Sequence, residues 1–253
     1  MRKYGQHFLI SPQVIEAIVS AVPQSTADLV EIGPGRGALT EELLQKNFPS
    51  FTLVEIDPAM RDVLLQKFPQ LQGHIVLADF LTFDLDTLPP RPTFFVSNLP
   101  YIDAADILDK VLSWPHFAGA VFMFQKEQAQ RILASVRQEG YGPISILTQL
   151  RARPRRLLRV GRACFNPPPK VESMVLTFEP LPAVLTPAEY ARFARLVRAS
   201  FAHKRKTLFN SLVLSGWDKE RVTDALARAG VAPAARAQEI SLEKFLEIHR
   251  LLS

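Results

Sequence analysis

Short apolar runs alternate with helical patterns along the first two thirds of this chain, and no other feature constrains its fold as strongly. Five runs have the length of buried strands, at 29–32, 51–56, 74–77, 94–96 and 118–124. The segments that lie between and after them carry apolar residues at helical spacing, at 39–46, 59–68, 104–112 and 126–137. This alternation is typical of βαβ units, whose parallel strands share one sheet. The sequence therefore predicts an α/β fold with a mostly parallel sheet.

The pattern changes after about residue 151. Two further runs, 155–161 and 173–179, look like closing strands and bring the expected sheet to seven strands. A proline-rich stretch from Pro180 to Pro187 then indicates a linker. Beyond it, apolar stripes at helical spacing continue to the end of the chain. We therefore predict an α/β domain over residues 1–180 and a small all-helical domain over residues 181–253.

Length and composition exclude several classes of protein. With 253 residues, of which 47% are hydrophobic, the chain can fill a sizeable core. No stretch approaches about 18 consecutive apolar residues, and no signal-peptide pattern opens the chain, so we expect a soluble cytoplasmic protein. Cys164 is the only cysteine, which excludes an internal disulfide and a thiolate metal cluster. We expect a monomer without a bound metal.

Positive charge is concentrated in the second part of the chain. Residues 1–150 carry 11 basic and 16 acidic side chains, whereas residues 151–253 carry 19 basic and 9 acidic ones. The basic side chains form two clusters: Arg151, Arg153, Arg155, Arg156, Arg159 and Arg162, then Lys204, Arg205 and Lys206. Basic residues at this density are typical of proteins that bind nucleic-acid phosphates. A solvated basic surface is the alternative interpretation.

The tetrapeptide Asn98-Leu99-Pro100-Tyr101 follows the predicted strand at 94–96. In open α/β sheets, ligands bind at the carboxyl ends of the strands. The Asn98 amide oxygen and the Leu99 carbonyl can both accept hydrogen bonds from one exocyclic amine, while Pro100 stiffens the turn and Tyr101 offers a ring for stacking. Such a site suits chemistry on an adenine amino group, although Asn-x-Pro also forms ordinary turns.

A glycine-rich loop, residues 33–37, follows the first predicted strand. Its spacing lacks the third glycine of the dinucleotide fingerprint, and no Gly-Lys-Ser/Thr follows, so it suits a nucleoside held without phosphates. Glu55 ends the second strand, where a carboxylate can accept both ribose hydroxyls. Asp79 follows the third and can accept from an adenine amine, with Ile56 or Phe80 packing on the ring. These groups converge on one crevice with Asn98.

Taken together, these motifs resemble the class I S-adenosylmethionine-dependent methyltransferases, and specifically the small-subunit (16S) rRNA adenine dimethyltransferases of the KsgA family. The likeness runs nearly from end to end, and its residues are 5–9, 31–35, 54–57, 79–80, 98–101, 125–127, 165–173, 204–208 and 210–212. The resemblance implies a Rossmann-like fold and S-adenosylmethionine as cofactor. It also implies that methyl groups pass to two adjacent adenines of small-subunit rRNA, within a pre-ribosomal particle.

The resemblance also assigns roles to individual residues. Contacts to the cofactor are expected from His7, Leu9, Gly33, Gly35, Glu55, Ile56, Asp79, Phe80 and Asn98. The flipped target adenine is expected between Asn98, Leu99, Pro100 and Tyr101 on one side and a stacking Phe165 on the other. RNA contacts are expected from Arg153, Arg155, Arg156, Lys170, Lys204, Arg205 and Lys206.

Three departures from the family pattern concern the site. His7 stands where many members have Asn, Ser97 where Gly or Ala is usual, and 102–104 reads Ile-Asp-Ala instead of Asn-Ile-Ser, which puts Asp103 near the target pocket. Two other functions stay open on the sequence alone. One is a large-subunit (23S) rRNA adenine methyltransferase that confers antibiotic resistance, and the other is a non-catalytic rRNA-binding assembly factor.

Overall fold

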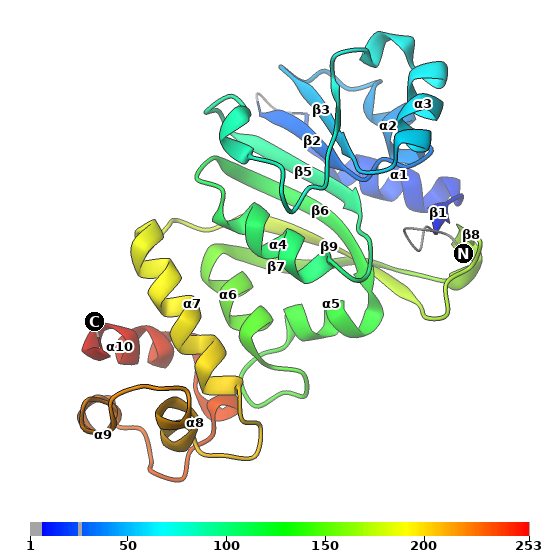
Figure 1. Cartoon of the computed structure of the whole chain (residues 1–253). Coiled ribbons are helices and arrows are strands. Elements are labelled where there is room, and N and C mark those ends of the chain that lie inside the picture. The colour runs from blue at the N-terminus through cyan, green and yellow to red at the C-terminus, as the bar shows by residue number, and fades with distance from the viewer. Residues whose placement is uncertain (1–6, 25–26, 253) are drawn as a thin grey trace. The chain divides into compact units, whose positions relative to one another are not determined.

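The computed structural model describes residues 7–24 and 27–252 and divides into two compact units (Figure 1). The first unit comprises residues 1–129 and 152–180, and the second comprises 130–151 and 181–253. The predicted boundary after Pro180 coincides with one of these division points. The sequence placed residues 130–151 in the first domain, but the structure groups them with the C-terminal helices, because Ile146, Leu147 and Leu150 pack into the core of the second unit.

A seven-stranded sheet forms the centre of the first unit, which confirms the predicted α/β fold. In spatial order the strands are β4 (Ile75–Leu77), β3 (Phe51–Glu55), β2 (Asp28–Ile32), β5 (Thr93–Asn98), β6 (Phe117–Gln125), β9 (Ser173–Pro180) and β7 (Ala152–Val160). The pairs from β4 to β6 are parallel, and β9 is antiparallel to both of its neighbours. The sheet is therefore mostly parallel.

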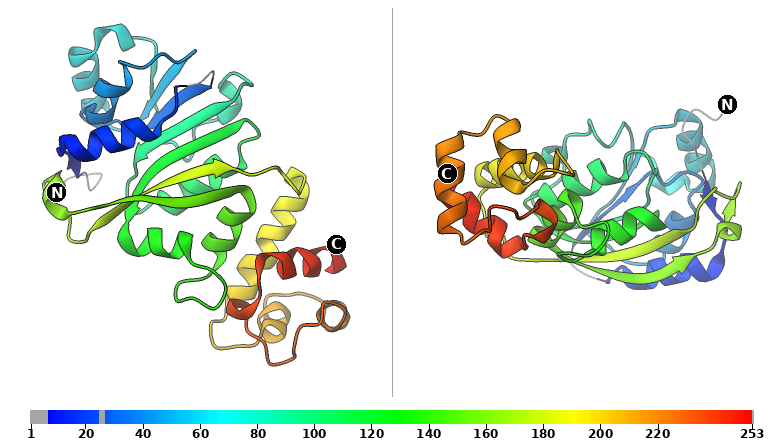
Figure 2. Two further views of the ribbon diagram at one scale, coloured as in Figure 1. Left: turned by 180° about the vertical axis from the view of Figure 1, so that it is seen from behind. Right: turned by 90° about the horizontal axis from the view of Figure 1, so that it is seen from below.

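Helices cover both faces of this sheet. The helices of the first unit are α1 (Pro12–Ala21), α2 (Ala38–Leu43), α3 (Pro58–Lys67) and α4 (Ala104–Ser113), with short 3-10 turns η1 (Pro69–Leu71), η2 (Leu85–Thr87) and η3 (Arg162–Cys164). Ile18, Leu43 and Leu64 of α1, α2 and α3 join one core with the strand residues Leu53 and Val121. Figures 1 and 2 show α1 on one face and α4 on the other.

The order of the strands reverses at one point along the sheet. From β2 the chain moves outward to β3 and β4, and it then returns to place β5 on the other side of β2. The crevice at such a reversal is where open α/β sheets bind ligands. The glycine loop after β2 and Asn98 at the end of β5 lie at this reversal point, as the motifs predicted.

A separate two-stranded sheet joins distant parts of the first unit. β1 (Phe8–Leu9) pairs antiparallel with β8 (Phe165–Asn166), so that Leu9 lies opposite Phe165. The backbone N–H of Ile10 extends this pairing by donating to the carbonyl of Cys164 (2.8 Å). The N-terminal segment is thereby held against the proline-rich motif that precedes β9.

The second unit is helical, as the stripes beyond the linker predicted. Its helices are α6 (Pro143–Arg151), α7 (Pro187–Phe201), α8 (Leu208–Leu214), α9 (Lys219–Arg228) and α10 (Leu242–Leu252), with a 3-10 turn η4 (Ala237–Glu239), and α5 (Lys126–Leu133) runs across the division between the units. Helix α6 has no amphipathic signature in the sequence, because five of its nine residues are buried. Within the described ranges, no helix is long and apolar enough to cross a membrane.

Candidate active site

The glycine loop is shaped for close approach by a ligand. Gly33 and Gly35 adopt left-handed backbone angles, with φ of 62° and 56°, which glycine reaches at no steric cost. A Cβ on Gly35 would lie 3.2 Å from the ring of Phe8, whereas a Cβ on Gly33 would meet no atom within 4 Å. The loop is thus packed against the N-terminal segment at Gly35 and open at Gly33, where the backbone can meet a ligand.

Glu55 is tied to this loop through both carboxylate oxygens. Oε2 accepts from the backbone N–H of Gly35 (2.9 Å), and Oε1 accepts from that of Asp57 (2.9 Å). Burial raises the pKa of Glu55, and these two hydrogen bonds oppose the rise because they favour the charged form. A carboxylate has about four acceptor sites, so one held in this way can still accept two hydroxyl groups.

A second carboxyl group, Glu31, lies buried near Glu55. The Thr40 hydroxyl donates to its Oε2 (2.7 Å). The pKa of Glu31 is raised to about 8, chiefly by burial and also by the charge of Glu55, while the Thr40 hydrogen bond opposes the rise. Glu31 therefore keeps its proton at neutral pH, which spares Glu55 a neighbouring negative charge. The sequence motif contains Glu31 but gives no sign of this proton, because its cause is burial among distant residues.

Asp79 and its neighbours are divided between the surface and the core. The Oδ1 atom of exposed Asp79 accepts from the N–H of Leu81 (2.9 Å), which forms a local turn. The ring of Phe80 is only 5% exposed and contacts Phe95, so it belongs to the core, whereas Ile56 is 41% exposed at the end of β3. Ile56, and not Phe80, presents apolar surface where the sequence predicted packing on a base.

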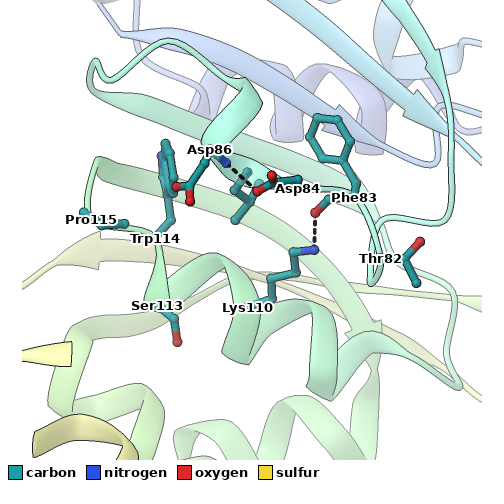
Figure 3. A pocket seen from close by; sticks show the side chains of 9 residues that line it. Thr82, Phe83, Asp84, Asp86, Lys110, Ser113, Trp114 and Pro115 are labelled. Atoms are coloured by element: carbon teal, nitrogen blue, oxygen red, sulfur yellow. Dashed lines mark hydrogen bonds between the residues drawn. The ribbon is translucent and has the colours of Figure 1, made fainter. Parts of the chain in front are cut away.

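Lys110 fixes the loop that carries Asp79. Its ammonium group donates to the carbonyls of Phe80 (2.8 Å) and Leu81 (2.9 Å). It also donates to the carbonyl of Phe83, and Figure 3 shows this third hydrogen bond. Burial lowers the pKa of Lys110, and the charges of Asp79 and Asp84 oppose this. Beside it lies a cavity of about 520 Å³, lined by Thr82, Phe83, Asp84, Leu85, Asp86, Lys110, Ser113, Trp114 and Pro115. This cavity contains none of the predicted site residues.

The amide of Asn98 has a defined orientation. Its Nδ2 donates to the backbone carbonyl of His7 (3.1 Å). Because a carbonyl oxygen can only accept, the amide must present its nitrogen to His7, and Oδ1 is left as an acceptor. The His7 imidazole in turn donates from Nδ1 to the carbonyl of Pro167 (2.8 Å). Its ring plane makes an angle of 27° with that of Tyr101, with ring centroids 6.0 Å apart. The structure therefore brings His7, Asn98 and Tyr101 together.

The rest of the tetrapeptide is anchored on both sides. Leu99 is 2% exposed, and the Tyr101 hydroxyl is hydrogen bonded to the Ser173 hydroxyl (2.8 Å) at the start of β9. Burial raises the pKa of Tyr101, and this hydrogen bond opposes the rise. The departure at Ser97 has a structural reason, since its hydroxyl donates to the carbonyl of Ile32 (2.6 Å) and links β5 to β2. The sequence pattern gave no role to Ser173, although it ends the proline-rich motif.

Phe165 does not lie where the sequence predicted. Its side chain is 2% exposed and belongs to the core with Leu9, its partner across β1 and β8. A ring buried in this way offers no face to a base, so the predicted stacking role is not supported. Its packing instead holds the N-terminal segment, whose His7 carbonyl orients Asn98. Pro100 is exposed, and Asp103 precedes α4 without a side-chain capping bond.

The basic residues predicted to bind RNA are exposed in both units. Arg153 and Arg155 lie on β7, the edge strand of the sheet, and share Glu179 at 3.5 Å and 3.8 Å. Arg156 lies at an irregularity of the same strand, and Lys170 precedes β9. In the second unit, residues 204–206 are exposed in the turn between α7 and α8. Across 7–24 and 27–252, no cluster of three or more His, Cys, Asp or Glu side chains is suited to a metal.

Three features define a class I methyltransferase. They are the doubly wound sheet, the glycine loop hydrogen bonded to the Glu55 carboxylate, and the Asn-Leu-Pro-Tyr turn at the reversal point. The whole chain, residues 1–253, also matches the family described as ribosomal RNA adenine dimethylase. A relative from Synechococcus sp. (strain JA-3-3Ab), named ribosomal RNA small subunit methyltransferase A, is 39% identical to this chain over 99% of this chain and 92% of the relative. A relative of the same name from Syntrophotalea carbinolica is 38% identical over 99% of this chain and 96% of the relative. The chain belongs to the ribosomal RNA adenine dimethylase family.

Two solved structures share the fold over nearly the whole chain. A dimethyladenosine transferase from Plasmodium falciparum matches with a TM-score of 0.80 and 26% identity, over 96% of both chains. The 23S rRNA methyltransferase ErmE matches with a TM-score of 0.69 and 30% identity, over 97% of this chain and 99% of that one. The family resemblance seen in the sequence is thereby confirmed.

Proposed function

We propose that this protein transfers methyl groups from S-adenosylmethionine to the exocyclic amines of two adjacent adenines in small-subunit rRNA, giving N6,N6-dimethyladenines. The orientation of the Asn98 amide carries the proposal. With Nδ2 donating to His7, the Asn98 Oδ1 and the Leu99 carbonyl are acceptors that can take the two N–H bonds of one amine. The names of the small-subunit relatives support rRNA as the substrate, and such a substrate would place the enzyme in the cytoplasm.

S-adenosylmethionine would be held at three points along this edge of the sheet. Glu55 would accept both ribose hydroxyls, with its carboxylate held by Gly35 and Asp57. Asp79 would accept from the adenine amine, while the exposed side chain of Ile56 would cover the ring. The open side of Gly33 would admit the remainder of the cofactor. His7 and Leu9 would act through the N-terminal segment that closes this end of the sheet.

The residues catalyse mainly by position. The cofactor supplies an electrophilic methyl group. An adenine amine is a poor nucleophile because its lone pair is delocalised into the ring, and hydrogen bonds to Asn98 and Leu99 would favour a more tetrahedral nitrogen whose lone pair faces the methyl group. Fixed acceptors of this kind cost no reorganisation during the reaction. No protein nucleophile is needed, and the proton leaves after the new bond forms.

The exposed basic residues would hold the RNA backbone. Those on β7, together with Lys170, would bind phosphates along the first unit, and residues 204–206 would bind them from the second unit. Such contacts orient the RNA but read no sequence, so we propose that a preformed RNA shape within a pre-ribosomal particle selects the target. We propose that the enzyme acts as a monomer.

A large-subunit target is the second candidate, favoured by the match to ErmE. The test is methyl incorporation from labelled S-adenosylmethionine into purified, unmethylated small and large ribosomal subunits, followed by mass mapping of the rRNA. Dimethyladenine at two adjacent positions of the small-subunit rRNA is the expected result. Label confined to the large subunit would establish the second candidate, and cofactor binding without any methyl transfer would indicate a non-catalytic assembly factor.

A further inference from the structure

Ile102, which directly follows Tyr101, is 91% exposed. Single exposed apolar residues are ordinary on protein surfaces, but this one lies in the turn between the target-binding tetrapeptide and α4. A branched aliphatic side chain exposed to water at this point gains nothing for folding, because it loses no water when the chain folds.

The turn that carries Ile102 is anchored by buried residues on both sides. Leu99 is 2% exposed before it and Ala104 is 0% exposed after it. The Tyr101 hydroxyl is also tied to Ser173 across the edge of the sheet. The side chain is therefore presented on a fixed support. A group that is already ordered loses little conformational freedom when it binds.

We propose that Ile102 is a wedge that enters the base stack of the RNA when the target adenine leaves it. This inference rests on the proposed function. An enzyme that modifies the amine of a stacked base must take the base out, which costs stacking free energy. Apolar side chains that insert between bases recover part of that cost in other nucleic-acid-binding proteins. The flipped adenine would lie on Tyr101, and the adjacent residue would fill the gap that it leaves.

A second exposed aliphatic side chain supports an apolar contact at this edge. Val171 is 44% exposed and lies two residues before Ser173, the partner of Tyr101. Two basic residues lie near Val171 and can contact phosphates: Lys170 precedes it in the sequence, and Arg159 lies on the adjacent strand β7. A surface with apolar side chains among cations matches the chemistry of RNA, in which stacked bases lie between phosphates. A second protein would match this surface less well.

The test uses the RNA hairpin that contains the mapped target, with 2-aminopurine in place of the adenine. Its fluorescence rises when the base leaves the stack. We expect the Ile102→Ala variant to flip the base about tenfold less, which corresponds to about 1.4 kcal/mol, and to methylate the unmodified small subunit about tenfold more slowly. Ile102→Leu should restore both, and binding of S-adenosylhomocysteine should not change. Leu214→Ala, which truncates another exposed aliphatic side chain (61% exposed) on α8, should behave as wild type.

An RNA that lacks the base next to the target separates a wedge from a general contact. In this RNA the target base has lost a stacking partner, so little stacking remains for Ile102 to replace. Ile102→Ala should therefore flip the base as well as wild type does. Two results would refute the wedge. One is an equal loss of base flipping by Ile102→Ala on both RNAs, and the other is wild-type fluorescence and methylation rate for Ile102→Ala on the normal hairpin. Failure of the wild-type enzyme to methylate small-subunit RNA would instead refute the proposed function. The fluorescence comparison needs no methyl transfer, so the two failures can be told apart.

Discussion

Replacing Glu55 by alanine should weaken cofactor binding through two separate losses. The first is the pair of hydrogen bonds proposed between the carboxylate and the ribose hydroxyls. One hydrogen bond to a charged group contributes about 1.5–3 kcal/mol, so the loss of even one of the pair corresponds to about a 10- to 150-fold rise in Kd. The second loss is structural, because the N–H groups of Gly35 and Asp57 both donate to Glu55 at 2.9 Å. Without that acceptor the glycine loop loses its fixed position.

Calorimetry with two ligands separates these losses. The ligands are S-adenosylhomocysteine and its analogue without ribose hydroxyls, each titrated into wild type and Glu55→Ala. Structural damage weakens both ligands alike, whereas the ribose bonds exist only for the first, so the difference isolates their contribution. Glu42→Ala, which removes an exposed carboxylate from α2, serves as the control and should bind both ligands as wild type does. An equal loss of affinity for the two ligands would refute the ribose assignment.

Three further predictions concern chemistry, RNA binding and stability. Asn98→Ala should lower the single-turnover methylation rate about a hundredfold, as the removal of one preorganised group does elsewhere, with RNA affinity nearly kept; a wild-type rate at saturating cofactor and RNA would make Asn98 structural. Neutralising Lys204, Arg205 and Lys206 together should weaken RNA binding and leave cofactor affinity unchanged. The slope of log affinity against log salt should become shallower by about 0.7 to 0.9 for each phosphate that is no longer bound. An unchanged slope would show that the cluster is a solvated surface. Glu31 keeps its proton up to about pH 8 in the folded protein but loses it near 4.5 when unfolded, so its contribution to stability falls as pH rises between these values, by at most about 1.4 kcal/mol per pH unit. Glu31→Gln removes this dependence. In urea unfolding, the free energy of unfolding of the variant should therefore rise relative to that of wild type between pH 5 and pH 8. An equal difference between the two proteins at both pH values would contradict the buried proton.

The sequence by itself determined the strands of the seven-stranded sheet and the positions of the motifs along them. Parallel strands all end at one edge, so the glycine loop, Glu55, Asp79 and Asn98 had to meet there once the alternation of strands and helices was recognised. Local patterns suffice for this conclusion, because the period of apolar residues and the direction of the chain decide it. The family resemblance rested on the same motifs.

Burial was decided only by the tertiary structure. The pairing of β1 with β8 joins residues 8 and 166, and it places Phe165 in the core, although the family resemblance had implied a ring that stacks on the target base. The proton on Glu31 results from helices and strands that surround it from distant parts of the chain. Residues 143–151 are buried on most sides, so their helix left no amphipathic stripe. The exposure of a single side chain depends on everything that packs around it, and a pattern of neighbours along the chain does not contain that information.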